Sequence, residues 1–147
     1  MILGTGIDII EVERVAGSVE RFGDRFLQRI LGPEEIAYCR SHKNPGPHIA
    51  ARFAAKEAIS KAFGTGIGAA LGWQDIEIRR RSSGEPYVQF HGKALDLLAA
   101  RGGRRVHVSL SHTLTYAAAV AVLEGGPESE PGGWVDPSQA TAPVQVP

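Results

Sequence analysis

Apolar residues follow first a strand pattern and then helical patterns. Residues 1–10 alternate as a short strand does, with Ile2, Gly4, Gly6, Asp8 and Ile10 sharing one face. One face is expected to be core, and the face that carries the glycines is nearly bare. Apolar residues then recur at helical spacing over residues 12–22, until Gly23 interrupts and Asp24 is placed to cap a second short helix.

Further elements are predicted along the rest of the chain. A helix is expected to begin near Pro33, and the strongest helical pattern covers residues 49–63 and stops at Gly64. The remaining predictions are strands at 73–80 and 87–90, a helix at 93–100, and strands at 105–111 and 116–123 that form a hairpin. Because helices and strands are segregated, the fold class is α+β, a single domain of helices packed on a mainly antiparallel sheet.

Composition indicates one folded domain followed by a tail. The chain has 147 residues, 43% of them hydrophobic and 22% charged, which suits a single globular core. Residues 125–147 hold four glycines and five prolines but neither Lys nor Arg. We therefore expect a domain at residues 1–124 and a flexible Pro/Gly-rich tail at residues 125–147.

Several classes of protein are excluded. The longest wholly apolar run, residues 117–123, has seven residues, whereas a membrane span needs about 20. Cys39 is the single cysteine, so we expect neither an intrachain disulfide nor a thiolate metal cluster, and a reducing cytoplasm fits best. Sixteen basic residues balance sixteen acidic ones, which argues against nucleic acid or an anionic membrane as partner. Residues 1–124 are mildly basic, with 16 basic and 13 acidic side chains.

The first candidate functional residues are Glu57 and Lys61, which share a ridge of the helix predicted at residues 49–63. A surface ion pair is the simpler interpretation. Two other ridges of this helix, however, carry mostly small apolar residues, which indicates that the helix is buried on more than one side. Its few polar side chains are therefore expected to have a function. Gly64, Thr65 and Gly66 follow, as a helix end or as a backbone that offers N–H groups to phosphate.

Asp8 and His112 add two further candidates. Asp8 lies beside Gly4 and Gly6, where space is expected, and it is either a capping residue or one of two carboxylates that bind a hard cation such as Mg²⁺. His112 ends a predicted strand and is either a hydrogen-bonded structural residue or a ligand. Neither HExxH nor GxSxG occurs, which argues against a zinc protease and a serine hydrolase.

A stripe of arginines lies near the N-terminus. Arg14, Arg21, Arg25 and Arg29 would line one side if the first two helices were nearly continuous, which Gly23 makes doubtful. The stripe is either a solvated helix face or a docking surface for an acidic partner.

Three segments together resemble a known family. They are Gly4-Thr5-Gly6-Ile7-Asp8 followed by Arg14, the central segment of residues 52–58 and 61–66, and Ser109-Leu110-Ser111-His112 followed by residues 116–119. In order and spacing these segments resemble the holo-acyl-carrier-protein synthases, small single-repeat 4′-phosphopantetheinyl transferases. The likeness covers about residues 1–124.

The resemblance implies a Mg²⁺-dependent transfer of 4′-phosphopantetheine from coenzyme A (CoA) to a serine of apo-acyl carrier protein, by a homotrimer with CoA at its subunit interfaces. Adenosine 3′,5′-bisphosphate is the other product. By motif, Asp8 and Glu57 match metal-binding acids, and Lys61 matches a phosphate-contacting lysine. Residues matching the family's CoA-binding positions are Lys43, Lys61, Gly64, Thr65, Gly66, Pro86 and His112. Arg14, Arg21 and Arg25 lie where the family docks the carrier protein.

Some alternatives stay open at this point. The proton acceptor is Glu57, Asp8 or a metal-bound water, and the sequence does not choose among them. A non-catalytic module that binds CoA or a nucleotide and a purely structural oligomer are the other function classes.

Overall fold

Residues 1–126, which the computed structural model describes, form helices and strands in the order that the sequence predicts. The predicted tail at residues 125–147 lies outside this range except for its first two residues. The elements are β1 (Ile2–Glu11), α1 (Val12–Phe22), α2 (Asp24–Ile30), α3 (Pro33–Arg40), α4 (Gly46–Phe63), a 3₁₀ turn η1 (Trp73–Asp75), β2 (Ile76–Arg80), β3 (Pro86–Phe90), α5 (Lys93–Ala100), β4 (Gly103–His112) and β5 (Tyr116–Gly125).

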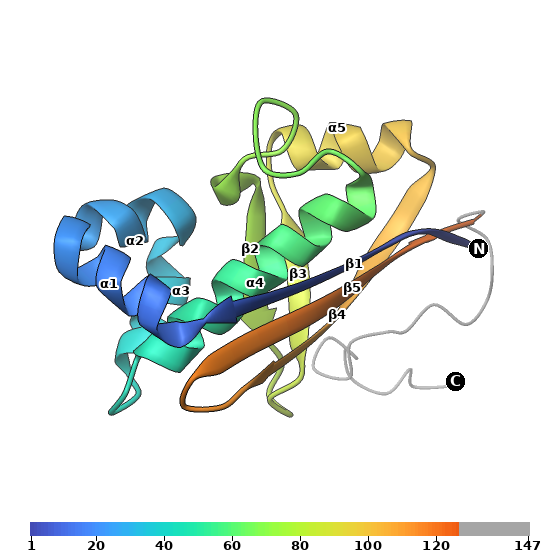
Figure 1. Ribbon diagram of the computed structural model, residues 1–147. Coiled ribbons are helices and arrows are strands. Elements are labelled where there is room, and N and C mark those ends of the chain that lie inside the picture. The colour runs from blue at the N-terminus through green and yellow to red at the C-terminus, as the bar shows by residue number, and fades with distance from the viewer. Residues whose placement is uncertain (127–147) are drawn as a thin grey trace, which may run out of the picture.

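The strands form two antiparallel units. A three-stranded sheet has the order β1-β5-β4, and β2 and β3 form a two-stranded sheet. Helix α4 lies along one face of the three-stranded sheet, and α1, α2 and α3 gather at one end of it (Figure 1). This arrangement confirms the predicted α+β class.

The contact between β1 and α4 explains the bare face of the strand. A side chain at Gly4 would overlap the carbonyl oxygen of Ala62, and one at Gly6 would overlap that of Ala58. The glycines therefore let the helix backbone approach the strand closely. The expectation of free space beside Asp8 is wrong at these two positions, because α4 fills it.

Helix α4 contributes to both hydrophobic clusters of the described core. Ala58, Ile59 and Phe63 pack with the sheet residues and α5, whereas Ile49 and Ala50 pack with α1, α2 and α3. Lys56 lies between these clusters and is fully buried. Its ammonium donates to the Glu35 carboxylate at 2.9 Å and to the carbonyls of Ile30 at 2.7 Å and Trp73 at 3.1 Å.

Some element boundaries differ from the sequence prediction. Residues 73–75 form a 3₁₀ turn instead of the start of a strand, because the Asp75 carboxylate accepts a hydrogen bond from the backbone N–H of Gly72. Helix α4 begins at Gly46, three residues before the predicted start, since Pro47 suits the first helical turn. Asp24 makes no capping hydrogen bond and instead pairs with Arg40.

The first two helices are separate. Gly23 has φ of 62°, a conformation that glycine adopts readily, and the chain turns there between α1 and α2. Among residues 1–126, no helix combines the length and the apolar character that crossing a membrane requires.

Candidate active site

Asp8 and Lys61 meet where β1 passes the C-terminal part of α4. The Lys61 ammonium lies 3.1 Å from the Asp8 carboxylate and donates to the backbone carbonyl of Ile7 at 2.9 Å. The Lys61 side chain is 51% exposed and that of Asp8 is 18% exposed. The ammonium is therefore held by two contacts and still reaches solvent, where a phosphate group could approach it.

Glu57 lies beside this pair, one helical turn before Lys61. Its pKa is raised, first by partial burial and then by the negative charge of Asp8, while Lys61 acts in the opposite direction. Two carboxylates thus crowd around one ammonium. Binding of an additional positive charge at this site is therefore electrostatically favourable.

A hard divalent cation fits this donor set. Mg²⁺ is commonly held by one or two carboxylates, with water and substrate phosphates completing its coordination. Within residues 1–126, no group of three or more His, Cys, Asp or Glu residues is placed to hold a metal. Asp8 and Glu57 therefore suit a cation that the substrate helps to bind, and not a metal held by protein ligands alone.

In the glycine segment after α4, the backbone N–H groups are already hydrogen-bonded within the chain. The N–H of Gly64 donates to the carbonyl of Lys61 at 2.9 Å, and those of Thr65 and Gly66 donate to the carbonyl of Ser60 at 3.2 Å. Arg101 also donates to the Phe63 carbonyl at 2.6 Å. These donors cap the helix end, so any phosphate contact here must come from side chains or from a rearranged loop.

His112 lies in a cluster of aromatic side chains at the other end of α4. Its ring centroid is 4.8 Å from that of His48, and the rings of His48 and His42 stack at 3.6 Å. Tyr38 lies edge-on to His42 at 4.8 Å. The pKa of His48 is lowered to about 4, first by burial and then by His42 and His112.

The predicted site residues thus fall into two groups on opposite sides of α4. Glu57 follows His48 by nine residues, and at about 100° per residue their side chains point about 180° apart. Lys43 follows His42 in an exposed loop, and Pro86 pairs with Arg80, whose guanidinium carbon lies 5.1 Å from the Tyr38 ring. Both therefore belong with the histidines and not with Asp8.

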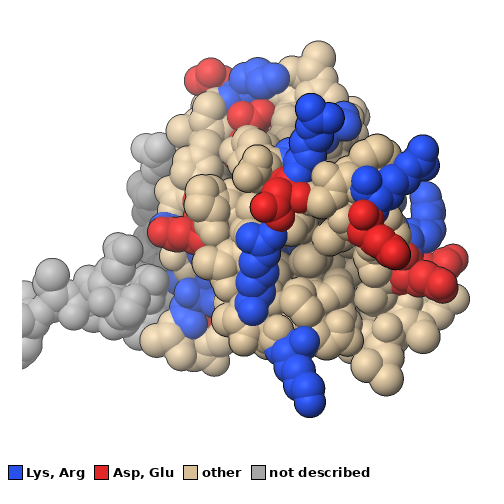
Figure 2. Space-filling model, turned by 90° about the vertical axis from the view of Figure 1, so that its left-hand side faces the viewer, with Lys and Arg blue, Asp and Glu red and all other residues tan. Residues whose placement is uncertain are grey.

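The three docking arginines are exposed on two helices. Arg14 and Arg21 lie seven residues apart on α1, and Arg25 lies on α2 beyond the turn at Gly23. The stripe is thus discontinuous, as Gly23 suggested. Basic and acidic side chains alternate over this end of the molecule (Figure 2).

Sequence reasoning gave no role to Arg52, Tyr38, His42 and His48. A signal existed, because His48, Arg52, Lys56 and Ser60 form an i, i+4 ridge of polar residues within a largely apolar helix. The structure buries Arg52, Lys56 and Ser60 in the core.

Comparison with known proteins identifies the family. The chain belongs to the 4′-phosphopantetheinyl transferase superfamily, whose family model matches residues 4–120. A holo-[acyl-carrier-protein] synthase of Koribacter versatilis is 56% identical over 124 residues, which are 84% of this chain and 99% of that protein. The corresponding protein of Syntrophus aciditrophicus is 44% identical over 125 residues, 85% of this chain and 98% of that protein.

Solved structures show the same fold. The holo-[acyl-carrier-protein] synthase of Neisseria meningitidis superimposes with a TM-score of 0.79 at 36% identity, covering 84% of this chain and 99% of that one. The Helicobacter pylori synthase, solved in complex with coenzyme A, gives a TM-score of 0.74 at 34% identity, covering 82% and 99%.

Proposed function

We propose that this chain transfers the 4′-phosphopantetheine group of CoA to a serine hydroxyl of apo-acyl carrier protein and releases adenosine 3′,5′-bisphosphate. The observation that carries the proposal is the grouping of Asp8, Glu57 and Lys61 in a member of this transferase family. Phosphoryl transfer needs positioning and charge stabilisation, and these side chains provide both.

Each side chain has a distinct task in this proposal. Asp8 and Glu57 would hold Mg²⁺, which when bound neutralises charge on the diphosphate of CoA. Lys61, oriented by Asp8 and the Ile7 carbonyl, directs its ammonium at a phosphate oxygen. The proton of the serine hydroxyl would pass to Glu57, to Asp8 or to a water bound to the metal.

We further propose that the active site is shared between copies in a homotrimer. The CoA-binding candidates lie on opposite sides of α4, so one CoA cannot reach both groups of a single chain without passing the helix. Lys61 and Gly64–Gly66 of one copy would face Lys43, Pro86 and His112 of another.

The sheet face turned away from α4 supports this assembly. Ile7 and Ile9 are 69% and 68% exposed, and their cross-strand neighbours on β5 are Val120 and Ala118. An apolar face of this kind suits burial against other copies of the chain. The buried free thiol of Cys39 suits a reducing cytoplasm.

Carrier-protein docking is assigned to Arg14, Arg21 and Arg25. All three are exposed near the chain segment that follows Asp8. Reversing Arg14 and Arg21 to Glu should raise KM for the carrier about tenfold and weaken its salt dependence, while KM for CoA stays unchanged. Unchanged carrier KM and salt dependence would show that this surface is only a solvated helix face.

The decisive experiment is mass spectrometry of apo-acyl carrier protein incubated with this protein, CoA and Mg²⁺. The carrier should gain the mass of phosphopantetheine, whereas a binding module or structural oligomer would leave it unchanged. Asp8→Ala and Glu57→Ala should each lower turnover by about 10³-fold, since the metal contributes several kcal/mol. Residual activity should need more Mg²⁺, and wild-type Mg²⁺ dependence would contradict the metal assignment.

Mixing two inactive variants tests the shared site. Glu57→Ala and His112→Ala, mixed under conditions that exchange subunits, should regain part of the activity that each lacks alone. The reason is that some mixed sites take Glu57 from one copy and His112 from another. Absence of recovery in a verified mixed assembly would contradict sharing.

A further inference from the structure

A groove of about 520 Å³ lies between β3, β4 and α5. Its apolar floor includes Val88, Leu98 and Val106. Strand β3 belongs to the two-stranded sheet and β4 to the three-stranded sheet, so the edges of two sheets flank the groove. Backbone groups at a sheet edge can pair with an extended segment of chain, and an apolar floor can bury a side chain of that segment. The groove therefore suits a peptide that carries a large apolar side chain.

Arginines outnumber acidic side chains around this groove. Arg81, Arg104 and Arg105 line it together with one acidic residue, Glu85. Arg81 lies 3.3 Å from the Glu85 carboxylate, and Arg105 lies 2.8 Å from that of Glu124. The guanidinium of Arg104 is half-buried and makes neither a hydrogen bond nor an ion pair within residues 1–126. One positive charge at the groove therefore lacks a counterion in this part of the chain.

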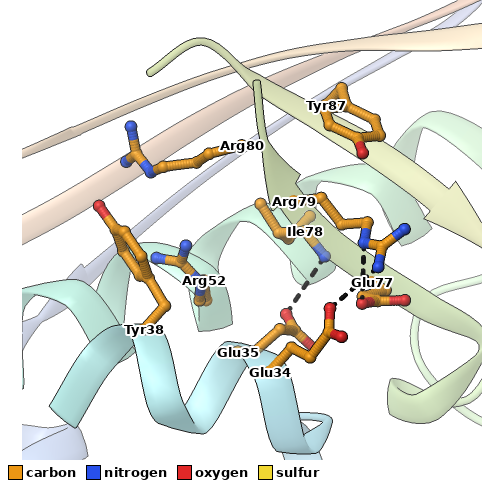
Figure 3. A pocket seen from close by; sticks show the side chains of 9 residues that line it. All are labelled: Glu34, Glu35, Tyr38, Arg52, Glu77, Ile78, Arg79, Arg80 and Tyr87. Atoms are coloured by element: carbon orange, nitrogen blue, oxygen red, sulfur yellow. Dashed lines mark hydrogen bonds and ion pairs between the residues drawn. The ribbon is translucent and has the colours of Figure 1, made fainter. Parts of the chain in front are cut away.

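A second cavity, between α3, α4 and the β2–β3 hairpin, differs from the groove in charge. The three arginines that line it are matched by three glutamates. Figure 3 shows Arg79 of this cavity in contact with Glu34 and Glu77. An acidic segment would thus meet balanced charge in this cavity but an excess of positive charge at the groove.

The chain leaves β5 beside one end of the groove. Gly125, the last residue of β5, pairs with Gly103 at the start of β4, and Leu98 lies against Gly103. Residues 127–147 carry three acidic side chains, neither Lys nor Arg, and one tryptophan. Trp134 follows Gly126 by eight residues, which can span up to about 29 Å, whereas residues 104–108 of β4 span about 14 Å. The tryptophan can therefore reach the whole length of the groove along β4.

We propose that residues 127–147 bind in this groove of their own chain, with Trp134 on the apolar floor and the acidic side chains beside Arg104. Residues 1–126 carry 16 basic and 13 acidic side chains, so the two parts of the chain are complementary in charge. Covalent attachment gives the segment an effective concentration of about the millimolar range at the groove, so a weak contact is sufficient. The proposal does not depend on the transferase activity.

Quenching of Trp134 fluorescence by acrylamide in the full chain tests this contact. Trp73, the other tryptophan, is first replaced by phenylalanine, which keeps an aromatic ring against Phe53. Quenching of Trp134 should be about threefold weaker than in a synthetic peptide of residues 127–147, because the buried ring is less accessible. Quenching as strong as in the peptide would overturn the proposal.

Two changes should each release the tryptophan in this background. Arg104→Glu places a negative charge beside the acidic segment. Replacing the three acids of the segment by Glu128→Gln, Glu130→Gln and Asp136→Asn removes its charge and leaves residues 1–126 unaltered. Each change should raise quenching towards that of the peptide, and the combined effect should be smaller than the sum, since both remove the same interaction.

Arg29→Glu is the matched control, because Arg29 is an exposed arginine of α2. This variant should leave the quenching of Trp134 unchanged. If Trp134 stays protected both in Arg104→Glu and in the variant without the three acids, the segment binds elsewhere and the proposal is overturned.

A mixing experiment separates binding within one chain from binding between copies. The reporter chain carries Arg104→Glu, and an excess of a second chain carries Trp134→Phe, Trp73→Phe and the three neutral substitutions, so that its groove is intact and open. The two are mixed under conditions that exchange subunits. The reporter should remain as strongly quenched as before mixing. Recovered protection would place the segment in the groove of a neighbouring copy and would overturn the proposal.

Discussion

Two ridges of α4 carry polar residues that differ in burial. On the ridge of Ile49, Phe53, Glu57 and Lys61, hereafter the Glu57 ridge, the polar residues reach solvent and face a second carboxylate. On the ridge of His48, Arg52, Lys56 and Ser60, hereafter the Arg52 ridge, the last three are buried in the core. Together with Asp8, the Glu57 ridge has two carboxylates for one ammonium and suits a metal, whereas on the Arg52 ridge two nitrogen atoms of Arg52 lack hydrogen-bond partners among residues 1–126. A polar residue in a helix therefore does not by itself indicate exposure.

Breaking the buried ion pair of the Arg52 ridge should have the largest effect on stability. Lys56→Met should lower the free energy of unfolding by about 3–5 kcal/mol, because Glu35 is left as an uncompensated buried charge. Lys61→Met on the Glu57 ridge should change it by less than about 1 kcal/mol, since that ion pair is half exposed. Urea unfolding measures both, and equal losses would erase the contrast between the ridges.

Removing the exposed lysine should instead act on catalysis. Lys61→Ala should lower kcat about 100-fold with a smaller change in KM for CoA, because a cation aimed at the phosphate matters most when charge redistributes in the transition state. Lys61→Arg keeps the charge and should recover part of the loss. Steady-state kinetics would contradict this role if only KM for CoA changed.

The smallest expected effect concerns His48 on the Arg52 ridge. Its pKa of about 4 lies below the ordinary value of 6.5, so between these values the unfolded chain binds a proton that the folded chain excludes. Stability is therefore lost as the pH falls through this window. His48→Gln should remove about 1 kcal/mol of that loss, a figure reduced for partial exposure. Urea unfolding at about pH 7 and about pH 5 measures it, and identical pH dependence in both proteins would contradict the assignment.

Local patterns predicted the elements well, because periodicity and helix ends such as Gly23 and Gly64 are local properties. Burial of the Arg52 ridge was not predictable in this way. The Glu35 carboxylate that pairs with Lys56 comes from α3, 21 residues earlier, and only the tertiary fold brings them together. The predicted strand start at residue 73 failed for a different, local reason, since the hydrogen bond from the Gly72 N–H to the Asp75 carboxylate favours a 3₁₀ turn there.

The candidate site was predictable in part. Asp8, Glu57 and Lys61 emerged from spacing and resemblance, and the structure places Lys61 against Asp8 with Glu57 beside them. The separation of His112 from these residues was not predictable, because a motif records order along the chain and not the side of a helix. The same limit hid Arg52, whose missing partners are visible only once its surroundings are known.

The close approach of β1 to α4 limits which sequences this strand can accept. Even the methyl group of alanine at Gly4 or Gly6 would overlap a helix carbonyl, so a library selected only for folding should retain glycine at both positions. Ile7 and Ile9 face away from the helix and are exposed in the single chain, so the same selection should let them vary. A library selected for assembly should retain these isoleucines as well. Comparing the two libraries would separate the residues that the fold requires from those that the assembly requires.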